Sequence, residues 1–286
     1  MRLAWVALAA ALLLAGCGGD DLREARERAE ADLQARVDDL RDRAREAGDD
    51  FTRAVRRVLE DIRQAVPEAS LPTPQVRDEP SAISAYMTQV LESVDDYWTQ
   101  TLRASGLEEP RVTYAWVPQG RSALTGCQVV AGADAAFYCP ADDTIYIAER
   151  FALDVYNGIG DRFPGEQAGA GNAVGEFGLA YVVAHEYAHN VQFELGFYEL
   201  QDPGDGVKAF ELQADCMAGL WGNAVYRAGR YDDRDVEEAI STAQAAGDFD
   251  YGNAQHHGTP DERRTAWLAG FRSGDPAECR RFVPGT

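Results

Sequence analysis

The sequence predicts an α+β domain in which a small β-sheet comes before most of the helices, with a charged helical stalk in front of the domain. Segments rich in β-formers lie between residues 111 and 147, whereas helical periodicity dominates residues 177–271. Strands and helices do not alternate as they do in a parallel-sheet protein. The 286 residues are 45% hydrophobic, so the chain can bury a substantial core.

The charge balance and the distribution of apolar residues each exclude one class of protein. Acidic residues outnumber basic ones by 48 to 27, which gives a net charge of −21 and argues against a nucleic-acid partner, because phosphates need a basic surface. Only one apolar run approaches the length of a membrane span, and it lies at the N-terminus. A polytopic membrane protein is therefore excluded.

Residues 1–16 have the features of an export signal. Arg2 precedes an apolar stretch of about 12 residues, which is too short to cross a hydrocarbon core of about 30 Å. The following Leu14-Ala15-Gly16-Cys17 resembles the lipobox of bacterial lipoproteins, which implies cleavage before Cys17 and attachment of acyl chains to it. We therefore expect an exported protein with a lipid anchor in a membrane. The alternative is an ordinary secretory signal followed by an unrelated cysteine.

Residues 17–66 form the predicted stalk, and residues 67–80 form a proline-rich linker. From Asp20 to Arg63 the sequence has 14 acidic and 11 basic side chains, with apolar residues recurring every three or four positions on one helical stripe. The stalk could self-associate or bind an envelope partner, or it could be a solvated spacer. Four prolines end it, and the globular domain is predicted to span residues 81–286.

Within the domain, Ser81 is the expected cap of a first helix that extends to about residue 98. Strands are expected at 111–117, 128–131 and 144–147, and helices at 151–156, 177–195, 207–227, 232–246 and 260–271. The glycine-rich run 165–178 is expected to be a loop. It lacks the Lys-Ser/Thr ending of a phosphate-binding loop.

Four cysteines remain once Cys17 is set aside, an even number in a compartment that permits disulfides. No Cys-x-x-Cys spacing exists, which disfavours a cysteine zinc site. Of the three possible connectivities we favour Cys127–Cys139 with Cys216–Cys279, because the first pair is close enough to close a hairpin. Four free thiols are the alternative.

The strongest chemical pattern is His185-Glu186-Tyr187-Ala188-His189, which has the form H-E-x-x-H. On a helix, two histidines four residues apart project from one face and can bind one metal ion. Glu186 lies about 100° round the helix from His185, where it can take a proton from a metal-activated water. The pattern predicts His185 and His189 as ligands and Glu186 as the catalytic base.

Glu211 and Asp215 lie on the next predicted helix. A hydrolytic zinc site uses three protein ligands and keeps one position open, so Glu211 is the expected third ligand. Asp215, one turn later, could accept the second ring N–H of a ligand histidine. The Glu-x-x-x-Asp arrangement resembles that of the gluzincin metallopeptidases. A solvated helical carboxylate is the alternative for Glu211.

The other two histidines, His256 and His257, lie just before a predicted helix start at Thr259-Pro260. His257 is the candidate for stabilising an oxyanion opposite the metal. The alternative is a structural or exposed loop histidine. Tyr251 and Tyr187 are weaker candidates for the same task, because aromatic residues on such helices usually belong to the core.

Several motifs, in this order along the chain, together resemble the bacterial neutral zinc metallopeptidases. They are residues 137–140, 145–147, 185–192, 211–221 and 257–259 with Arg263 and Trp267, and then 274–276 with Cys279. The resemblance covers about residues 80–282. It implies a zincin-like fold, one zinc ion per chain, an envelope location and the same two disulfides. Pro260 departs from the family, which usually has a polar residue there.

The expected function is hydrolysis of peptide bonds in the cell envelope by zinc-activated water, with peptides or proteins as substrates. A strand at 145–147 could align an extended peptide through backbone hydrogen bonds. Two alternatives remain at this point. One is a non-catalytic envelope lipoprotein that a zinc ion stabilises and that serves as a binding or scaffold module. The other is metal-assisted hydrolysis of a non-peptide bond.

Overall fold

The computed structural model describes residues 80–159, 163–200 and 206–283. The predicted signal peptide, Cys17, the stalk and nearly all of the linker lie outside these ranges, so those interpretations stay predictions. No helix within these ranges has the length and apolar character needed to cross a bilayer.

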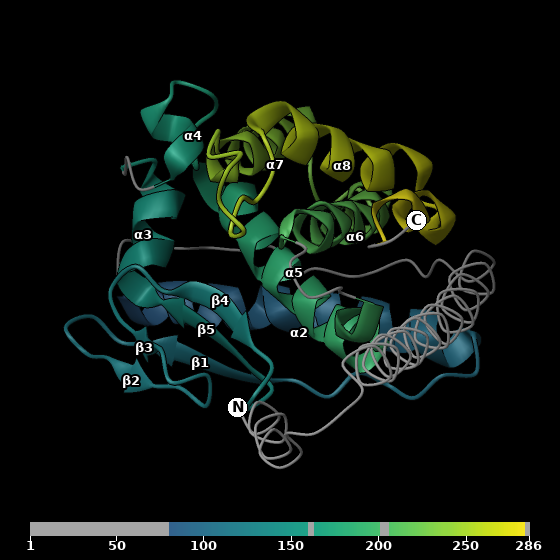
Figure 1. The fold of residues 1–286 in the computed structure, drawn as a ribbon, viewed down its shortest axis with the longest axis horizontal. Helices are drawn as coiled ribbons and strands as arrows, with labels where there is room; N and C mark the ends of the chain where they lie inside the picture. Colours follow the sequence, from purple (N-terminus) through teal and green to yellow (C-terminus); the bar gives the residue numbers. More distant parts are fainter. Residues whose placement is uncertain (1–79, 160–162, 201–205, 284–286) are drawn as a thin grey trace, which may run out of the picture. The chain divides into compact units, whose positions relative to one another are not determined.

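Two small sheets make up the β-structure (Figure 1). The first has the strand order β1 (Thr113–Val117), β5 (Thr144–Ala148), β4 (Ala136–Cys139). The β1–β5 pair is parallel, with Thr113 opposite Thr144, and the β4–β5 pair is antiparallel. The second sheet is the antiparallel hairpin of β2 (Ala123–Leu124) and β3 (Val130–Ala131).

The sheet differs from the sequence-based expectation in two respects. Strands β2 and β4 were not predicted, because they are only two and four residues long and give little periodicity to detect. The strand predicted at 144–147 lies between two partners, so both of its backbone edges are already hydrogen-bonded. It therefore cannot align a peptide as predicted, and the unpaired edges of this sheet belong to β1 and β4.

The domain is mostly helical, and the predicted helices are present within a few residues of their expected bounds. The predicted helices are α2 (Pro80–Ala104), which extends beyond the expected range, α3 (Glu149–Asn157), α5 (Gly175–Glu194), α6 (Lys208–Arg227), α7 (Asp233–Ala246) and α8 (Pro260–Ser273). The short helix α4 (Pro164–Gln167) and the 3₁₀ turns η1 (Phe197–Leu200) and η2 (Pro276–Phe282) were not predicted. Helix α2 starts at Pro80, so Ser81 lies inside it and is not its cap. The glycine-rich run is not all loop, since it contains most of α4 and the first turn of α5.

Helix α5 lies at the centre of the domain (Figure 1). It contacts α2, α3 and β4 on one side and α6 and α7 on the other. Every residue from Phe177 to Gln192 is buried. A helix that is covered on all faces needs apolar residues all round, and the sequence supplies them except at the chemically important positions. The H-E-x-x-H pattern is thus built into the most buried helix.

Helices α6 and α8 pack unusually close together because glycines replace side chains at their contact. A Cβ atom added at Gly270 of α8 would lie 1.9 Å from the carbonyl oxygen of Cys216, and one at Gly219 of α6 would lie 2.2 Å from that of Trp267. This close approach brings residues at the start of α8 against residues at the start of α6.

Both favoured disulfides are present. Cys216 of α6 is bonded to Cys279 of η2, across 63 residues of sequence. Cys127, in the turn of the β2–β3 hairpin, is bonded to Cys139 at the end of β4. The alternative of four free thiols is therefore wrong for the described structure.

Candidate metal centre and active site

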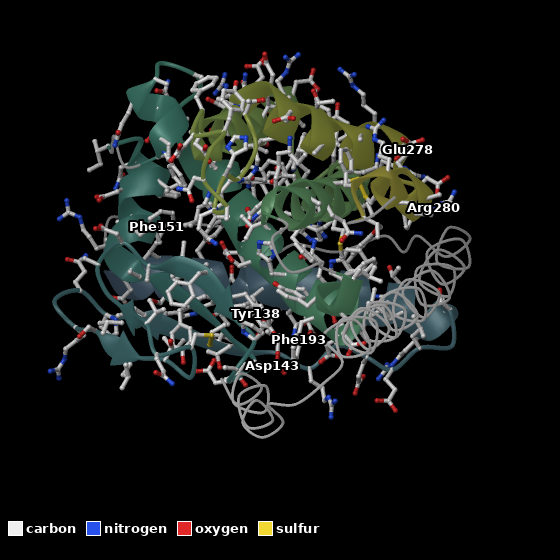
Figure 2. The ribbon with its side chains drawn as sticks, viewed as in Figure 1. Tyr138, Asp143, Phe151, Phe193, Glu278 and Arg280 are labelled. Atoms are coloured by element: carbon white, nitrogen blue, oxygen red, sulfur yellow. A yellow bond between two sulfur atoms is a disulfide. The ribbon has the colours of Figure 1, made fainter. Side chains whose placement is uncertain are left out.

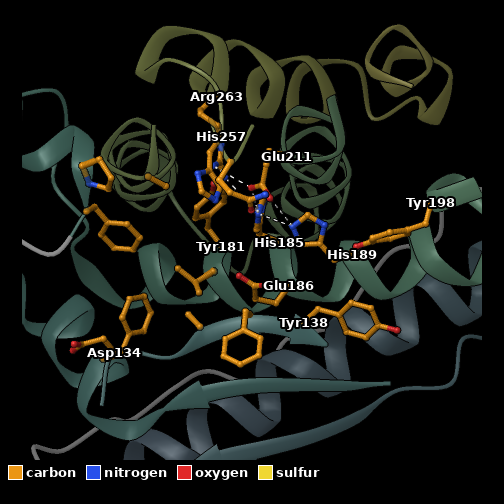
Figure 3. Close-up of a pocket in the computed structure, with 18 residues that line it drawn as sticks. Asp134, Tyr138, Tyr181, His185, Glu186, His189, Tyr198, Glu211, His257 and Arg263 are labelled. Atoms are coloured by element: carbon orange, nitrogen blue, oxygen red, sulfur yellow. Dashed lines mark hydrogen bonds and ion pairs between the residues drawn. The ribbon is translucent and has the colours of Figure 1, made fainter. Parts of the chain in front are cut away.

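His185, His189 and Glu211 come together between α5 and α6. The Nε2 atoms of the two histidines are 3.2 Å apart, and the carboxylate of Glu211 lies 3.2 Å from His185 Nε2 and 3.4 Å from His189 Nε2. Each residue offers one ligand atom, and these atoms all lie within 4.8 Å of one another. Among the described residues this is the one group of three side chains with that arrangement. Figure 3 shows the three side chains meeting above α5.

The donor set and its spacing fit zinc. Tetrahedral Zn²⁺ bound at about 2.0–2.1 Å would place neighbouring ligand atoms about 3.3 Å apart, close to the three distances in this cluster. Two imidazole nitrogens and one carboxylate oxygen are also the donors of many hydrolytic zinc sites. The three side chains could therefore hold a zinc ion without a large rearrangement.

The electrostatics of the cluster favour a bound cation. Burial alone would raise the pKa of Glu211, but the neighbouring His189 and His185 hold it well below its usual range, so the carboxylate is ionised. Burial alone would lower the pKa of His185, but its contacts with Asp215 and Glu211 raise it to about 9. Two buried carboxylates therefore stabilise positive charge at this point, whether a proton or a metal ion carries it.

Asp215 lies directly behind His185, with its Oδ1 3.0 Å from the ring Nδ1, although the two groups are poorly aligned for a hydrogen bond. The carboxylate is completely buried and has two further partners. Tyr181 donates to Oδ1 at 2.6 Å, and Arg263 donates to both oxygens, at 2.5 and 3.0 Å. This position agrees with the expected role of orienting His185.

Arg263 is the site residue that sequence reasoning missed. Its guanidinium is buried, forms a bidentate pair with Asp215, and places Nη1 3.3 Å from the Glu211 carboxylate. In the sequence it stands among acidic residues at a helix start, where an arginine resembles an ordinary surface residue. The sequence offered two clues: Arg263 belongs to the motifs that resemble the family, and Asp215, in an apolar stretch, needs a partner.

His189 also has a partner that the sequence analysis did not consider. Its Nδ1 lies 2.8 Å from Oε1 of Gln192, three residues further along the same helix. The amide nitrogen of Gln192 in turn donates to the carbonyl of Phe210 and to Gln213 on α6. A Gln acceptor fixes the proton on Nδ1 and leaves Nε2 free to bind a metal. The spacing of three residues after His189 could have identified it.

Glu186 projects from α5 toward β4, whereas the two histidines project toward α6 (Figure 3). It is mostly buried and lines the pocket beside the histidines. This is the position expected of a base that acts next to the metal ligands without being one of them.

His257 reaches the same pocket from the loop between α7 and α8. Its backbone N–H donates to Asp248 at 2.8 Å, and its Nδ1 lies 3.4 Å from the same carboxylate. His256 is buried instead, with Nδ1 2.5 Å from Asp248. Burial alone would raise the pKa of Asp248, but the backbone N–H of His257 and the His256 imidazole lower it to about 2.

The two tyrosines considered as alternatives to His257 do not line the pocket. Tyr187 donates to Asp95 of α2 at 2.6 Å, on the other side of α5, and Tyr251 is exposed on the loop. Tyr138 of β4 does line it, and its hydroxyl donates to Asp143 at 2.7 Å (Figure 2). Asn190 of α5 donates to the same Asp143, which ties β4 to the central helix.

His185, His189 and Glu211 line a cavity of about 520 Å³, which also has residues of β4 in its lining. The polar part of its lining includes the two ligand histidines, Glu186, Glu211, His257 and Arg263. The apolar part includes Phe151, Phe163, Pro164, Val182 and Ala246. A volume of this size accommodates one or two residues of a peptide.

Comparison with known proteins agrees with this geometry. The sequence profile of the family described as "Putative neutral zinc metallopeptidase" matches residues 46–282. The match therefore begins within the predicted stalk, N-terminal to the region in which the motifs were found.

Curated relatives are similar over much of the chain. The uncharacterized protein YpfJ of Escherichia coli K12 is 32% identical over 219 residues, which cover 69% of this chain and 70% of the relative. The uncharacterized protein Mb2605 of Mycobacterium bovis is 32% identical over 183 residues, which cover 55% and 58%. No solved structure matches the chain. The buried His-His-Glu cluster and the extent of these matches lead to one conclusion: this chain belongs to the family of putative neutral zinc metallopeptidases.

Proposed function

We propose that this protein is a zinc-dependent peptidase of the cell envelope with a zincin-like domain, in which His185, His189 and Glu211 hold one zinc ion. The observation that carries the proposal is that this cluster lines a peptide-sized cavity, with Glu186 in the same lining. The envelope location rests on the export signal and lipobox expected at residues 1–17.

When bound, zinc would supply a Lewis acid that acidifies a water molecule and polarises the scissile carbonyl. Glu186 takes the proton from the attacking water and returns it to the amine that leaves. Its burial next to the ligand histidines keeps this proton transfer short and away from bulk water.

His257 stabilises the oxygen that becomes negative during attack. Asp248 accepts the backbone N–H of His257 and lies near its Nδ1, so the ring is held with its other nitrogen available to the cavity. With Nδ1–H facing Asp248, the doubly protonated form of this ring is the one that can donate a hydrogen bond from Nε2 to the oxygen that becomes negative.

An extended peptide would bind along β4 and not along β5. Strand β4 is paired on one side only in its sheet, and Ala136, Phe137 and Tyr138 line the cavity. Backbone pairing with an edge strand gives affinity without much sequence preference. Preference would come from the apolar lining residues of the cavity, which would favour a hydrophobic side chain.

The test replaces Glu186 with Gln in the full chain. Because Glu186 is not a predicted ligand, zinc content should stay near one per chain, while hydrolysis of a quenched peptide library should fall by about 10³-fold or more. Glu194→Gln, on the same helix but outside the cavity, is the matched control and should keep the parental activity.

Three results would point elsewhere. A Glu186→Gln variant as active as the parent would remove Glu186 from the mechanism. A parent that binds zinc tightly and hydrolyses no peptide would favour the non-catalytic lipoprotein. Turnover of esters or other non-peptide substrates without turnover of peptides would favour metal-assisted hydrolysis of a non-peptide bond.

A further inference from the structure

An apolar surface patch lies on the β2–β3 hairpin, which has no part in the proposed chemistry. Among the described residues eight large hydrophobic side chains are exposed, and three of them belong to this hairpin. Leu124 is 76% exposed, Val130 is 61% exposed and Val129 is 52% exposed. Single exposed apolar residues are ordinary, but a group at one turn needs an explanation.

The pairing of the hairpin directs these side chains outward together. Leu124 lies directly opposite Val130, and directly paired residues project from the same face of a ribbon. Their neighbours Ala123 and Ala131 also form a pair, and Ala131 is completely buried. One face of the ribbon therefore packs on the domain while the other presents Leu124 and Val130.

The patch is held rigidly in this exposed position. The Cys127–Cys139 disulfide fixes the turn to β4, and the backbone N–H of Gly126 donates to Asp142 at 2.5 Å. Thr125 donates from its hydroxyl to the carbonyl of Val129. A preorganised apolar surface loses little conformational entropy when a partner covers it.

The segment that carries the patch is basic, although the chain as a whole is acidic and the carboxylate of Asp142 contacts the turn at Gly126. Residues 110–133 contain no Asp or Glu in a protein that has 48 of them, and they contain two exposed arginines, Arg111 and Arg121. Tyr114, in the same stretch, is also exposed. A chain with a net charge of −21 is repelled overall by an anionic surface, whereas this segment has a charge of the attractive sign. Arg111 lies 4.0 Å from Glu194, and Arg121 forms no ion pair within the described part of the chain.

We propose that the β2–β3 hairpin is the surface through which the domain rests on an anionic phospholipid bilayer. Leu124, Val129 and Val130 would enter the boundary between headgroups and acyl chains, with Arg111 and Arg121 near the phosphates. We favour a bilayer over a protein partner because the expected acyl chains on Cys17 would keep the domain close to a membrane.

This orientation would bring the cavity close to the membrane. The chain runs from β3 through only four residues, 132–135, into β4, and Asp134, Ala136, Phe137 and Tyr138 line the cavity. A bilayer at the hairpin therefore favours substrates whose cleavable segment lies next to the membrane. The proposal goes beyond hydrolysis itself and holds even if the site binds zinc without turnover.

The experiment places a tryptophan at the tip of the hairpin. The full-chain Leu124→Trp protein is mixed with vesicles of phosphatidylethanolamine and phosphatidylglycerol whose acyl chains carry bromine, which quenches nearby tryptophans. Ile159→Trp is the matched control, since Ile159 is also 61% exposed but lies at the end of α3. Emission is compared with that of the parent protein in the same vesicles.

We expect bromine to roughly halve the added emission at position 124 and to leave that at position 159 unchanged. Arg111→Gln with Arg121→Gln should weaken the quenching, as should neutral phosphatidylcholine. Equal quenching at both positions would overturn the proposal. So would the absence of quenching at position 124, even if the protein stays with the vesicles. A third result would also overturn it: a parent that is a dimer in solution without vesicles and a Leu124→Asp variant that is a monomer. The patch would then be an interface between two copies.

Discussion

At the scale of single residues, Arg263 decides how firmly the metal ligands are held. It is paired with Asp215, which supports His185, and it also contacts Glu211, so one buried guanidinium touches two of the groups around the cluster. The planar guanidinium presents a two-donor fork to Asp215 and a further donor to Glu211 in a fixed geometry, which the compact ammonium of a lysine does not reproduce.

Arg263→Lys should therefore weaken zinc binding by about 10- to 100-fold while the protein stays folded. The measurement is a competition titration of the metal-free protein against a chelator of known affinity. Arg264→Lys is the control, because Arg264 is the next residue but is exposed and outside the cavity. Unchanged affinity in Arg263→Lys would show that the guanidinium has no role in holding the ligands.

Asp248 gives the loop beside the cavity a predictable pH dependence. Its pKa is about 2 in the folded protein, against about 3.9 in an unfolded chain, so the unfolded state binds more protons between these values. Its contribution to stability is present in full above about pH 4 and is lost as the pH falls toward 2.

The Asp248→Asn variant should therefore be less stable than the parent by up to about 2 kcal/mol near neutral pH. The difference should shrink as the pH approaches 2. Urea unfolding of both proteins at pH 6 and at pH 3 checks this. A difference that grows on acidification would contradict the assigned direction of the pKa shift.

At the scale of elements, the α6–α8 contact explains how residues far apart in the sequence reach one site. Gly219 and Gly270 remove the side chains that would separate the helices, and Arg263 can then reach Asp215 across the gap. This packing does not tolerate an added Cβ at either glycine. In each case the nearest atom is a main-chain carbonyl oxygen of the other helix, which cannot move aside as a side chain can.

Gly270→Ala should destabilise the protein by about 1–3 kcal/mol, since the methyl group would meet the carbonyl of Cys216. Gly252→Ala is the control, because an added Cβ at Gly252 meets no atom within 4 Å. Thermal unfolding of the two variants gives the comparison. A similarly small change in both would mean that the helices can separate easily.

The elements also show what sequence reasoning can and cannot reach. The helices that carry the site were predicted because their apolar periodicity is long and because H-E-x-x-H depends only on local spacing. The parallel β1–β5 pair and Arg263 were not predicted, since each depends on a partner far along the chain. The roles of His257 and Asp248 depend on a loop whose conformation no local pattern specifies.

At the scale of the whole molecule, the two disulfides should contribute unequally. In the loop-entropy description, closing the 63 residues between Cys216 and Cys279 stabilises by about 4 kcal/mol, and closing the 12 between Cys127 and Cys139 stabilises by about 3 kcal/mol. The longer link also joins η2 to α6, next to the α6–α8 contact.

Replacing Cys216 and Cys279 together with Ser should accordingly lower the free energy of unfolding more than the same replacement of Cys127 and Cys139. Denaturant unfolding of the two double variants and the parent measures the order. The reverse order would indicate that the hairpin link stabilises the folded state beyond its effect on the unfolded chain.

The burial of α5 has a further consequence for how metal could enter or leave. Because every face of this helix is covered from Phe177 to Gln192, the two histidines cannot be released by local fraying of a surface helix. Exchange of the ion must pass through the mouth of the cavity, or wait until the whole domain opens. Loading of a newly made chain therefore needs either an open cavity mouth or a domain that has not yet closed around α5.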